Sequence, residues 1–426
     1  MSLGTFRRAA AVLVVLGVVG GTAAAPAFAA GPSAGAADGA GAVRWSPMSI
    51  AAAGECTFPA ADVKSKPWAL QRVLLDQLWA AGTGKDVTVA VIDTGVDASN
   101  PQLAGKVIDG GSLLKDRQTG KAVEGTGVTD KVGHGTKVAG IIAARPLPDR
   151  TGFVGLAPDA RILAIRQNDS DGNGDVTTLV AAINQAITAG AKVINISQDV
   201  RADNDKGEFE GRGALEEALK RAEHENVVVV ASSGNDGREG DTYPAAIETV
   251  LAVGASDRNN ERAPFSQYGD FVDIAAPGVD MLSTVPAGGQ CVDNGTSFSA
   301  PYVAGLAAVL KGMYPKWTAQ QIRTRIEQTA QRNERGANRF IGWGVVDPVK
   351  AVQSESAPAE SPSPDAKVKL DNVPIVAQPL GLAETQADRD ARTATFVLGG
   401  GGLAVAALAG GAVVLRDFRR RRGEHA

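Results

Sequence analysis

The chain is poor in the residue that most often accepts protons at neutral pH. Its 426 residues include only three histidines: His134, His224 and His425. His224 lies in a polar segment that reads as a helix at residues 215–225, and His425 lies in the terminal tail. A mechanism that requires a histidine base therefore has one candidate, His134.

The chain also lacks a basic stripe and a repeat. Its formal net charge of −4 is spread widely, and the part expected to fold shows no cluster of lysine and arginine suited to nucleic acid. No internal repeat of fixed period is apparent. We therefore expect no nucleic-acid partner and no repeat architecture.

One acidic run resembles a calcium loop but lacks an essential ligand. Asp169, Asp171, Asn173 and Gly174 match the opening of an EF-hand loop, yet Val180 stands where the twelfth-position carboxylate belongs. No pair of flanking EF-type helices appears. The run is interpreted as a solvated surface loop, and neither a metal nor another cofactor is expected in the chemistry.

The most informative motif present is Gly-Thr-Ser-Phe-Ser-Ala-Pro at residues 295–301. It places Ser297 at the start of an apolar helical run. Unpaired backbone N–H groups and the positive dipole end of a helix can stabilise an oxyanion there. A serine hydroxyl becomes a good nucleophile only when a base removes its proton, so the motif indicates a catalytic serine only if a base lies nearby.

A base and an orienting acid stand in two further motifs. Asp93 ends the apolar run at residues 87–92 and is followed by Thr-Gly, while His134 lies in Gly-His-Gly-Thr before a helical pattern. Taken singly, the Asp93 motif could be an Asx-turn, His134 could be a neighbour of a helix cap, and the Ser297 motif could be an ordinary capped helix start. Together they favour a catalytic triad of Asp93, His134 and Ser297.

Motifs in the order Asp, His, Ser resemble those of the subtilisin-like serine proteases. The resemblance runs from about residue 84 to residue 351 and implies an acyl-enzyme mechanism. Ser297 would attack the scissile carbonyl, His134 would move the proton, and Asp93 would hold the imidazole. Asn235, in the Gly-Asn turn after an apolar strand, resembles the side chain that donates to the oxyanion in this family.

The same resemblance implies two substrate-binding segments, which pair with an extended peptide by strand addition. One contains Ser197, Gln198 and Asp199, where the family often has glycines, and the other contains Gly174 and Asp175. Two carboxylates near the cleft suggest a preference for basic side chains in the substrate. The alternative is that both carboxylates point into solvent.

Short apolar strands alternate with helices along the chain, which predicts an α/β fold with a mostly parallel sheet covered on both faces. This agrees with the three-layer subtilisin-like domain that the resemblance implies. We expect strands at residues 87–92, 161–166, 192–197, 227–232 and 250–254. We expect helices at residues 135–144, 177–189, 213–225 and 297–314.

The two ends of the chain predict export and membrane attachment. Arg7 and Arg8 precede an apolar stretch and the sequence Ala-Phe-Ala, which is typical of a signal peptide cleaved after Ala29. Residues 396–415 carry no charge and are long enough to span a bilayer. The arginines that follow favour a cytoplasmic C-terminus, so the catalytic domain would face outward from the cell membrane. A buried core helix is the alternative for this segment.

These features divide the chain into six parts. They are a signal peptide (1–29), an N-terminal extension (30–81), a peptidase domain (82–352), a Pro-rich polar linker (353–395), a transmembrane helix (396–415) and a basic cytoplasmic tail (416–426).

The two cysteines, Cys56 and Cys291, lie in the extension and shortly before Ser297. An even count in an oxidising compartment favours one disulfide, with two free thiols as the alternative. Such a bond would hold the extension across the peptidase near its active site.

With its short extension, proline-rich linker, single span and arginine tail, the chain resembles a mycosin, a membrane-anchored subtilase associated with type VII secretion. That resemblance implies cleavage of a secreted protein or peptide substrate and contact with membrane components of the secretion system. Two other hypotheses remain: a general surface subtilase unrelated to secretion, and a mainly structural stabiliser of the secretion complex.

Overall fold

A computed structural model describes residues 56–116, 119–169, 174–200, 207–367 and 384–423. The predicted signal peptide and the first part of the extension lie outside these residues. The chain separates into two compact units, the first ending at Asp365 and the second beginning at Ala366. Each unit is described by itself.

The first unit is built on a seven-stranded sheet in the order β2-β3-β1-β4-β5-β6-β7, in which all neighbouring strands are parallel. The predicted α/β fold with a mostly parallel sheet is therefore confirmed. The strands are β1 (Thr88–Asp93), β2 (Val107–Ser112), β3 (Arg161–Arg166), β4 (Val193–Ile196), β5 (Val228–Ser232), β6 (Val250–Ser256) and β7 (Ile274–Pro277).

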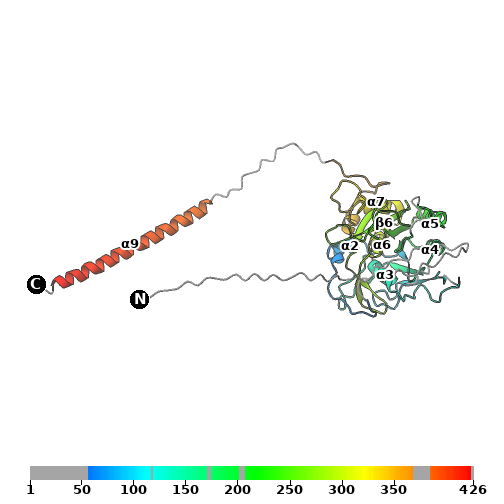
Figure 1. Cartoon of the computed structure of the whole chain (residues 1–426), viewed down its shortest axis with the longest axis horizontal. Helices are drawn as coiled ribbons and strands as arrows, with labels where there is room; N and C mark the ends of the chain where they lie inside the picture. Colours follow the sequence, from blue (N-terminus) through cyan, green and yellow to red (C-terminus); the bar gives the residue numbers. More distant parts are fainter. Residues whose placement is uncertain (1–55, 117–118, 170–173, 201–206, 368–383, 424–426) are drawn as a thin grey trace, which may run out of the picture. The chain divides into compact units, whose positions relative to one another are not determined.

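Helices cover both faces of this sheet (Figure 1). On β1, Val89 and Val91 pack into the same cluster as α3 (His134–Ala143) and α6 (Thr296–Met313). Ala90 and Ile92 point to the other face, into a cluster with α4 (Val176–Thr188) and α5 (Arg212–His224). Side chains alternate along a strand, so an unbroken apolar run such as β1 can fill two cores at once.

The carboxyl ends of the central strands carry the polar motifs. Asp93 is the last residue of β1, Ser197 follows β4, and Asn235 follows β5 by a short turn. In an open parallel sheet these ends meet at one edge, where such folds build their sites. The sheet therefore gathers residues from three distant parts of the sequence.

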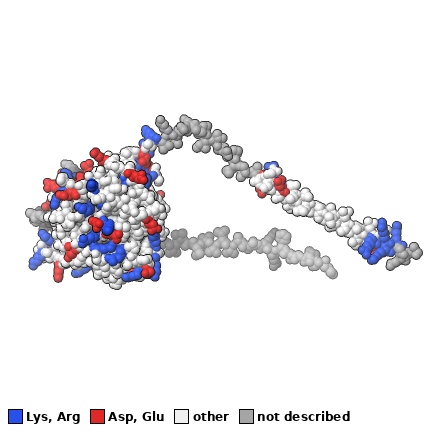
Figure 2. Space-filling view, turned by 180° about the vertical axis from the view of Figure 1, so that it is seen from behind, with Lys and Arg blue, Asp and Glu red and all other residues white. Residues whose placement is uncertain are grey.

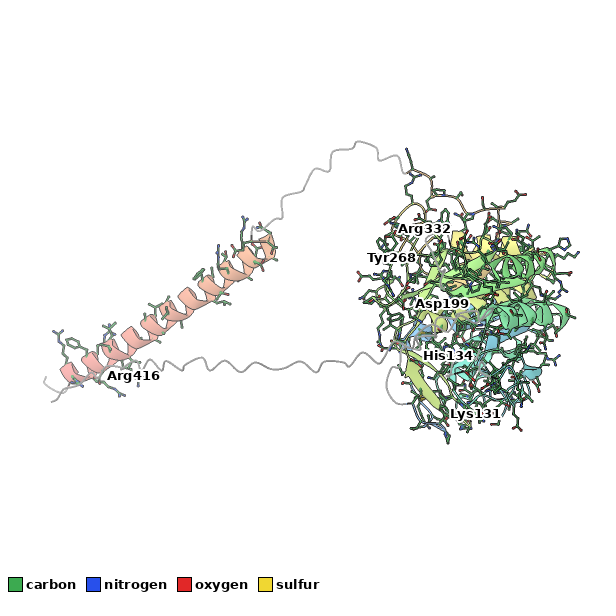
Figure 3. All side chains as sticks on the ribbon, turned by 45° about the vertical axis from the view of Figure 1, so that its right-hand side comes forward. Lys131, His134, Asp199, Tyr268, Arg332 and Arg416 are labelled. Carbon is green, nitrogen blue, oxygen red and sulfur yellow. A yellow bond between two sulfur atoms is a disulfide. The ribbon has the colours of Figure 1, made fainter. Side chains whose placement is uncertain are left out.

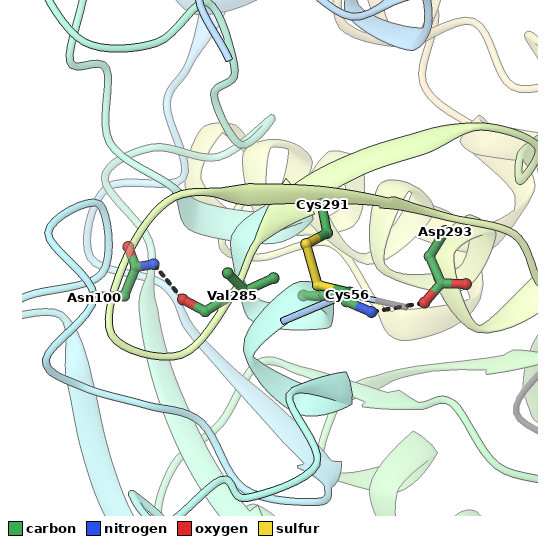
Figure 4. The surroundings of a disulfide bond; sticks show 6 residues. Cys56, Asn100, Val285, Cys291 and Asp293 are labelled. Carbon is green, nitrogen blue, oxygen red and sulfur yellow. Dashed lines mark hydrogen bonds and ion pairs between the residues drawn. A yellow bond between two sulfur atoms is a disulfide. The ribbon is translucent and has the colours of Figure 1, made fainter. Parts of the chain in front are cut away.

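The described part of the N-terminal extension runs across a two-stranded antiparallel hairpin, β8 (Met281–Thr284) and β9 (Gln290–Asp293). Cys56 is bonded to Cys291 of β9, with Cα atoms 6.1 Å apart (Figure 4). Further along, the Ala60 amide donates to the Gly288 carbonyl, and the Gln290 amide donates to the Ala61 carbonyl. The predicted disulfide is confirmed, and the extension is fastened to the peptidase body before α1 (Trp68–Gln71) and α2 (Leu75–Ala81).

The polar segment after α8 (Pro348–Gln353) packs on α7 (Ala319–Gln328) as far as Asp365. Arg325 of α7, which is buried, donates to the carbonyls of Ser354 and Ser356. Arg332 forms two hydrogen bonds with the Asp365 carboxylate, of 2.7 and 3.0 Å. The beginning of the segment expected to act as a linker from residue 353 is thus attached to the folded unit.

The second unit contains α9 (Gln386–Gly423), a helix long and apolar enough to cross a membrane. It includes the predicted span at residues 396–415 and extends beyond it at both ends. Figure 2 shows the uncharged stretch of this helix followed by a cluster of basic side chains, which are Arg416, Arg419, Arg420, Arg421 and Arg422.

Candidate active site

Asp93 and His134 form a buried hydrogen-bonded pair. The distance between His134 Nδ1 and Asp93 Oδ1 is 2.8 Å, and the two residues are 3% and 1% exposed. The Thr94 amide also donates to Asp93 Oδ1, at 2.7 Å, which fixes the carboxylate at the end of β1. Because an ionised carboxylate can only accept, Nδ1 carries the proton and Nε2 is left as the basic nitrogen.

The backbone at the start of α3, which carries His134, lies very close to the loop that follows Asp93. His134 is the first residue of α3, and Gly133 before it has the left-handed φ of 84°. A Cβ added to Gly135 would lie 2.0 Å from the Gly95 carbonyl oxygen. Any side chain at this position would push α3 away from the loop that follows Asp93, so the glycine is required by the geometry.

A second carboxylate, Asp130, ties the same two segments together. It accepts hydrogen bonds from the Thr94 hydroxyl at 2.9 Å and from the Gly133 and Thr136 amides at 2.7 and 2.9 Å. Burial raises the pKa of Asp130, although these donors oppose the shift. Asp130 was not among the predicted residues; its signal in the sequence is an acid four residues before the histidine, close to a helix start, where an acid can bind free amides.

Ser297 is the second residue of α6 and is 7% exposed. Its hydroxyl donates to the Ser197 carbonyl at 3.2 Å, while the Ser197 hydroxyl donates to the Ser297 carbonyl at 3.1 Å. The described hydrogen bonds include none between Ser297 Oγ and His134. Catalytic hydrogen bonds are often long or poorly aligned without substrate, so this geometry is compatible with a nucleophile and its base.

The aromatic ring of Phe298 places the nucleophile near the histidine. It packs 5.3 Å from the His134 ring, measured between centroids. Phe298 follows Ser297 directly, so the serine at the start of α6 lies beside the histidine at the start of α3. All three predicted catalytic residues are thus brought to one place.

Asn235 is held against the turn before Ser297. Its Oδ1 accepts from the Thr296 amide at 2.9 Å and from the Thr296 hydroxyl at 3.0 Å. With the carbonyl end of the amide occupied in this way, Nδ2 is the group left to donate to a ligand. This orientation suits a donor to an oxyanion formed next to Ser297.

The charge of Asp93 controls the protonation of His134. Burial by itself would lower the pKa of His134, but the charge and hydrogen bond of Asp93 outweigh it and raise this pKa above its ordinary value. The imidazole is therefore a stronger base than a free histidine, and it is protonated up to a higher pH.

The two segments expected to bind substrate lie next to each other. The side-chain amide of Gln198 donates to Gln167 Oε1. The side-chain amide of Gln167 in turn donates to the Asp175 carbonyl at 3.2 Å and to Thr178 Oγ1 at 2.9 Å. Gln167 therefore links the segment after β4 to the start of α4. Gly174 packs against Gln167, since a Cβ there would lie 2.9 Å from the Gln167 carbonyl oxygen.

The two acidic side chains of these segments have different surroundings. Asp175 caps α4, because its Oδ1 accepts from the Thr178 amide at 2.6 Å and its own backbone amide donates to the Thr178 hydroxyl at 3.0 Å. Asp199 lies beside the turn at Gly234 and Asn235 (the oxyanion turn). Its Oδ2 is 3.6 Å from the position that a Cβ on Gly234 would take. Figure 3 labels Asp199 and His134. Only Asp199 has its carboxylate placed at this turn.

The described residues contain no group of three or more histidine, cysteine, aspartate or glutamate side chains that could hold a metal ion.

Comparison with known proteins shows the family. Residues 84–344 match the model of the subtilase family, peptidase S8. The chain is 36% identical over 295 residues to subtilisin NAT of Bacillus subtilis subsp. natto, covering 68% of this chain and 72% of that protein. It is also 36% identical over 295 residues to a subtilisin of Bacillus pumilus, covering 68% of this chain and all of that one.

Solved structures of secretion-associated proteases are similar as well. MycP1 from Mycobacterium smegmatis is 30% identical with a TM-score of 0.63, covering 78% of this chain and 93% of that one. The MycP3 protease from the type VII (ESX-3) secretion system is 33% identical with a TM-score of 0.62, covering 69% and 90%. Together with the site geometry, these matches identify the chain as a subtilisin-like serine protease, a member of the subtilase family.

Proposed function

We propose that this protease is a mycosin-type endopeptidase, anchored in the cell membrane with its catalytic domain outside, that cleaves a protein substrate of type VII secretion. The observation that carries the proposal is the buried Asp93–His134 pair beside Ser297, in a domain similar to MycP1 and MycP3. The fastened N-terminal extension and the C-terminal helix α9 support it.

The proposed chemistry follows from the positions of four side chains. Ser297 attacks the scissile carbonyl as His134 Nε2 takes its proton, and the Asp93 carboxylate stabilises the resulting imidazolium. The Asn235 amide and the backbone N–H of Ser297 hold the oxyanion. His134 then gives the proton to the leaving amine, and water hydrolyses the acyl-enzyme by the same route in reverse.

The proposed topology rests on α9. Its uncharged stretch is followed by five arginines, and cationic residues are retained on the cytoplasmic side of a membrane. The catalytic domain, which precedes the helix, would then act at the outer face, where a disulfide is stable.

A fluorophosphonate probe, which reacts only with an activated serine, tests the catalytic part. The full chain should be labelled, and Ser297→Ala and His134→Ala should each abolish labelling. Ser299→Ala is the matched control, because this buried serine of α6 has no partner for its hydroxyl among the described residues. A folded wild-type chain that is not labelled would contradict an accessible triad.

A genetic comparison tests the secretion part and its structural alternative. If proteolysis of a secretion substrate is the main role, Ser297→Ala should abolish processing of that substrate as fully as deletion of the gene. Secretion that survives Ser297→Ala but not deletion would favour the structural role. Secretion unaffected by both would favour a general surface subtilase.

The place of Asp199 beside the oxyanion turn supports a preference for basic side chains in the substrate. A peptide library profiled with the wild-type protease should show lysine or arginine enriched at one subsite, and Asp199→Asn should reduce that enrichment about ten-fold, which corresponds to about 1.4 kcal/mol, the size of a hydrogen bond to a charged group. Asp241→Asn, which changes an exposed acid in the segment between β5 and β6, is the control. A profile without basic preference at any subsite would rule the idea out.

A further inference from the structure

A buried ion pair lies next to the catalytic residues without belonging to the triad. Lys137 Nζ is 2.7 Å from Asp293 Oδ2, and the two side chains are 10% and 5% exposed. Lys137 lies on α3 one helical turn after His134, and Asp293 is the last residue of β9, shortly before Ser297. The pair thus joins the helix that carries the base to the segment that delivers the nucleophile.

The pair shares an apolar ring with the catalytic histidine. Lys137 Nζ lies 6.0 Å from the centre of the Phe298 ring, and the His134 ring lies 5.3 Å from the same centre. Charges separated by an apolar ring and shielded from water interact more strongly than charges at a surface. Each member of the pair is therefore felt at the imidazole.

These charges act on His134 in opposite directions. The groups that influence it are Asp93, which contacts it directly, Lys137, which lowers its pKa, and Asp293, which raises it. The third nearby acid, Asp130, is buried and accepts hydrogen bonds from Thr94, Gly133 and Thr136. With both members present, the effects of Lys137 and Asp293 oppose each other.

Attachment of α3 to the hairpin does not by itself explain the pair. The Ser283 and Thr284 hydroxyls of β8 already donate to the Lys137 and Thr136 carbonyls, at 2.6 and 2.8 Å. The disulfide at Cys291, two residues before Asp293, adds a covalent tie (Figure 4). A buried ion pair is costly to desolvate and is weak evidence for stability, so its presence here calls for another role.

We propose that Lys137 and Asp293 are positioning residues for the catalytic histidine: they place two opposing charges beside the imidazole, which cancel there and leave Asp93 as the group that determines its protonation. The proposal rests on the serine protease activity and on His134 as its base. It makes no demand on the identity of the substrate or on the role in secretion.

The test measures how fast a fluorophosphonate labels Ser297 of the full chain in detergent micelles between pH 5 and 9. The acid midpoint of this profile reports the protonation of His134. Lys137→Met leaves Asp293 unopposed and should move the midpoint up by about half a pH unit to one pH unit. On the acid side of the profile, labelling should then be about three- to ten-fold slower. Asp293→Asn leaves Lys137 unopposed and should move the midpoint down by a similar amount.

Two further variants complete the design. Lys137→Met with Asp293→Asn removes both charges and should restore the wild-type midpoint within about 0.3 units. Lys131→Met removes an exposed lysine three residues before His134, labelled in Figure 3, and should leave the midpoint unchanged, since solvent screens its charge.

Opposite shifts distinguish this role from a purely structural one, because loosened packing would slow labelling at every pH without moving the midpoint up in one variant and down in the other. Shifts in the same direction, or none beyond the Lys131→Met control, would overturn the proposal. If circular dichroism shows Lys137→Met to be unfolded, Asp293→Asn decides alone. Its amide keeps the shape of the carboxyl and can still accept from the Asn294 amide, so an unchanged midpoint in this variant refutes the proposal.

Discussion

Among single residues, Asp93 has two functions that are set by one oxygen. Its Oδ1 accepts from both His134 Nδ1 and the Thr94 amide, so it holds the carboxylate to the strand end while it orients the imidazole. The same contact raises the pKa of His134. Tautomer, orientation and basicity of the histidine thus depend on a single acceptor.

That contact predicts the pH dependence of the protease. Only neutral His134 accepts the serine proton, and its raised pKa means that the imidazole becomes neutral at a higher pH than a free histidine. Labelling of Ser297 should therefore be slow at pH 5 and rise through a midpoint above about 6.5. The measurement is the rate of fluorophosphonate labelling across pH 5–9; a flat rate between pH 5 and 8 would contradict a histidine base.

The hydrogen bonds of Asn235 predict a selective loss of turnover. Asn235→Ala removes the donor but leaves the triad in place, so kcat for a peptide substrate should fall about 10²–10³-fold, the size known for the loss of such a donor in subtilisin, with little change in KM. Steady-state kinetics test this. A large increase in KM at unchanged kcat would show instead that Asn235 binds the ground state.

The triad could be predicted from sequence because each member stands in its own short motif. Asp130, Lys137 and Asp293 could not, because their roles depend on contacts between distant segments. Lys137 appeared only as one charge in an apolar helical run, and its partner lies 156 residues away. A single sequence shows such a charge but not its partner.

At the level of elements, the predicted helices agree with the structure, and each begins one residue earlier than expected, as α4 and α6 illustrate. The long apolar strands were also found. The strands that were not predicted are short or mixed in character: β2 contains two glycines and is half-exposed, and β9 is polar. Their formation depends on neighbours in the fold rather than on an apolar run of their own.

Two buried carboxyl groups, Glu327 of α7 and Asp273 before β7, predict how the stability of the protein depends on pH. Burial raises the pKa of Asp273 to about 7 and that of Glu327 to about 8, and Arg323 opposes both shifts. Because these pKa values are higher in the folded state than in the unfolded state, their contribution to stability is fully present below about pH 4, the ordinary pKa of such acids, and is lost as the pH rises from there through about 7 and 8. The free energy of unfolding should fall by about 2 kcal/mol or more between pH 5 and 9.

Glu327→Gln should flatten this profile, since the amide cannot ionise. Glu334→Gln, which changes an exposed acid, should leave it as in the wild type. Urea unfolding at a series of pH values measures the effect. If the free energy of unfolding falls with pH equally steeply in Glu327→Gln and the wild type, the two carboxyl groups are not protonated in the folded state at neutral pH.

At the level of the whole molecule, the contacts of residues 354–365 predict where the catalytic unit ends. A chain truncated after Asp365 keeps the partners of Arg325, Gln320 and Arg332, whereas one truncated after Gln353 leaves the buried Arg325 with fewer acceptors. The shorter chain should unfold at a temperature lower by about 3–5 °C, as expected for a loss of about 2 kcal/mol. Differential scanning calorimetry compares the two, and equal melting temperatures would show that this segment is a linker from its first residue.

The bond between Cys56 and Cys291 closes a ring of chain whose ends are 235 residues apart. Asp93, His134 and Asn235 lie inside this ring, and Ser297 lies outside it. Proteolytic cleavage at any single point inside the ring would give two polypeptides that remain one molecule until the disulfide is reduced. Processing of the extension beyond Cys56 would therefore release nothing from the protease, and a nicked protease would differ from the intact one only on a reducing gel.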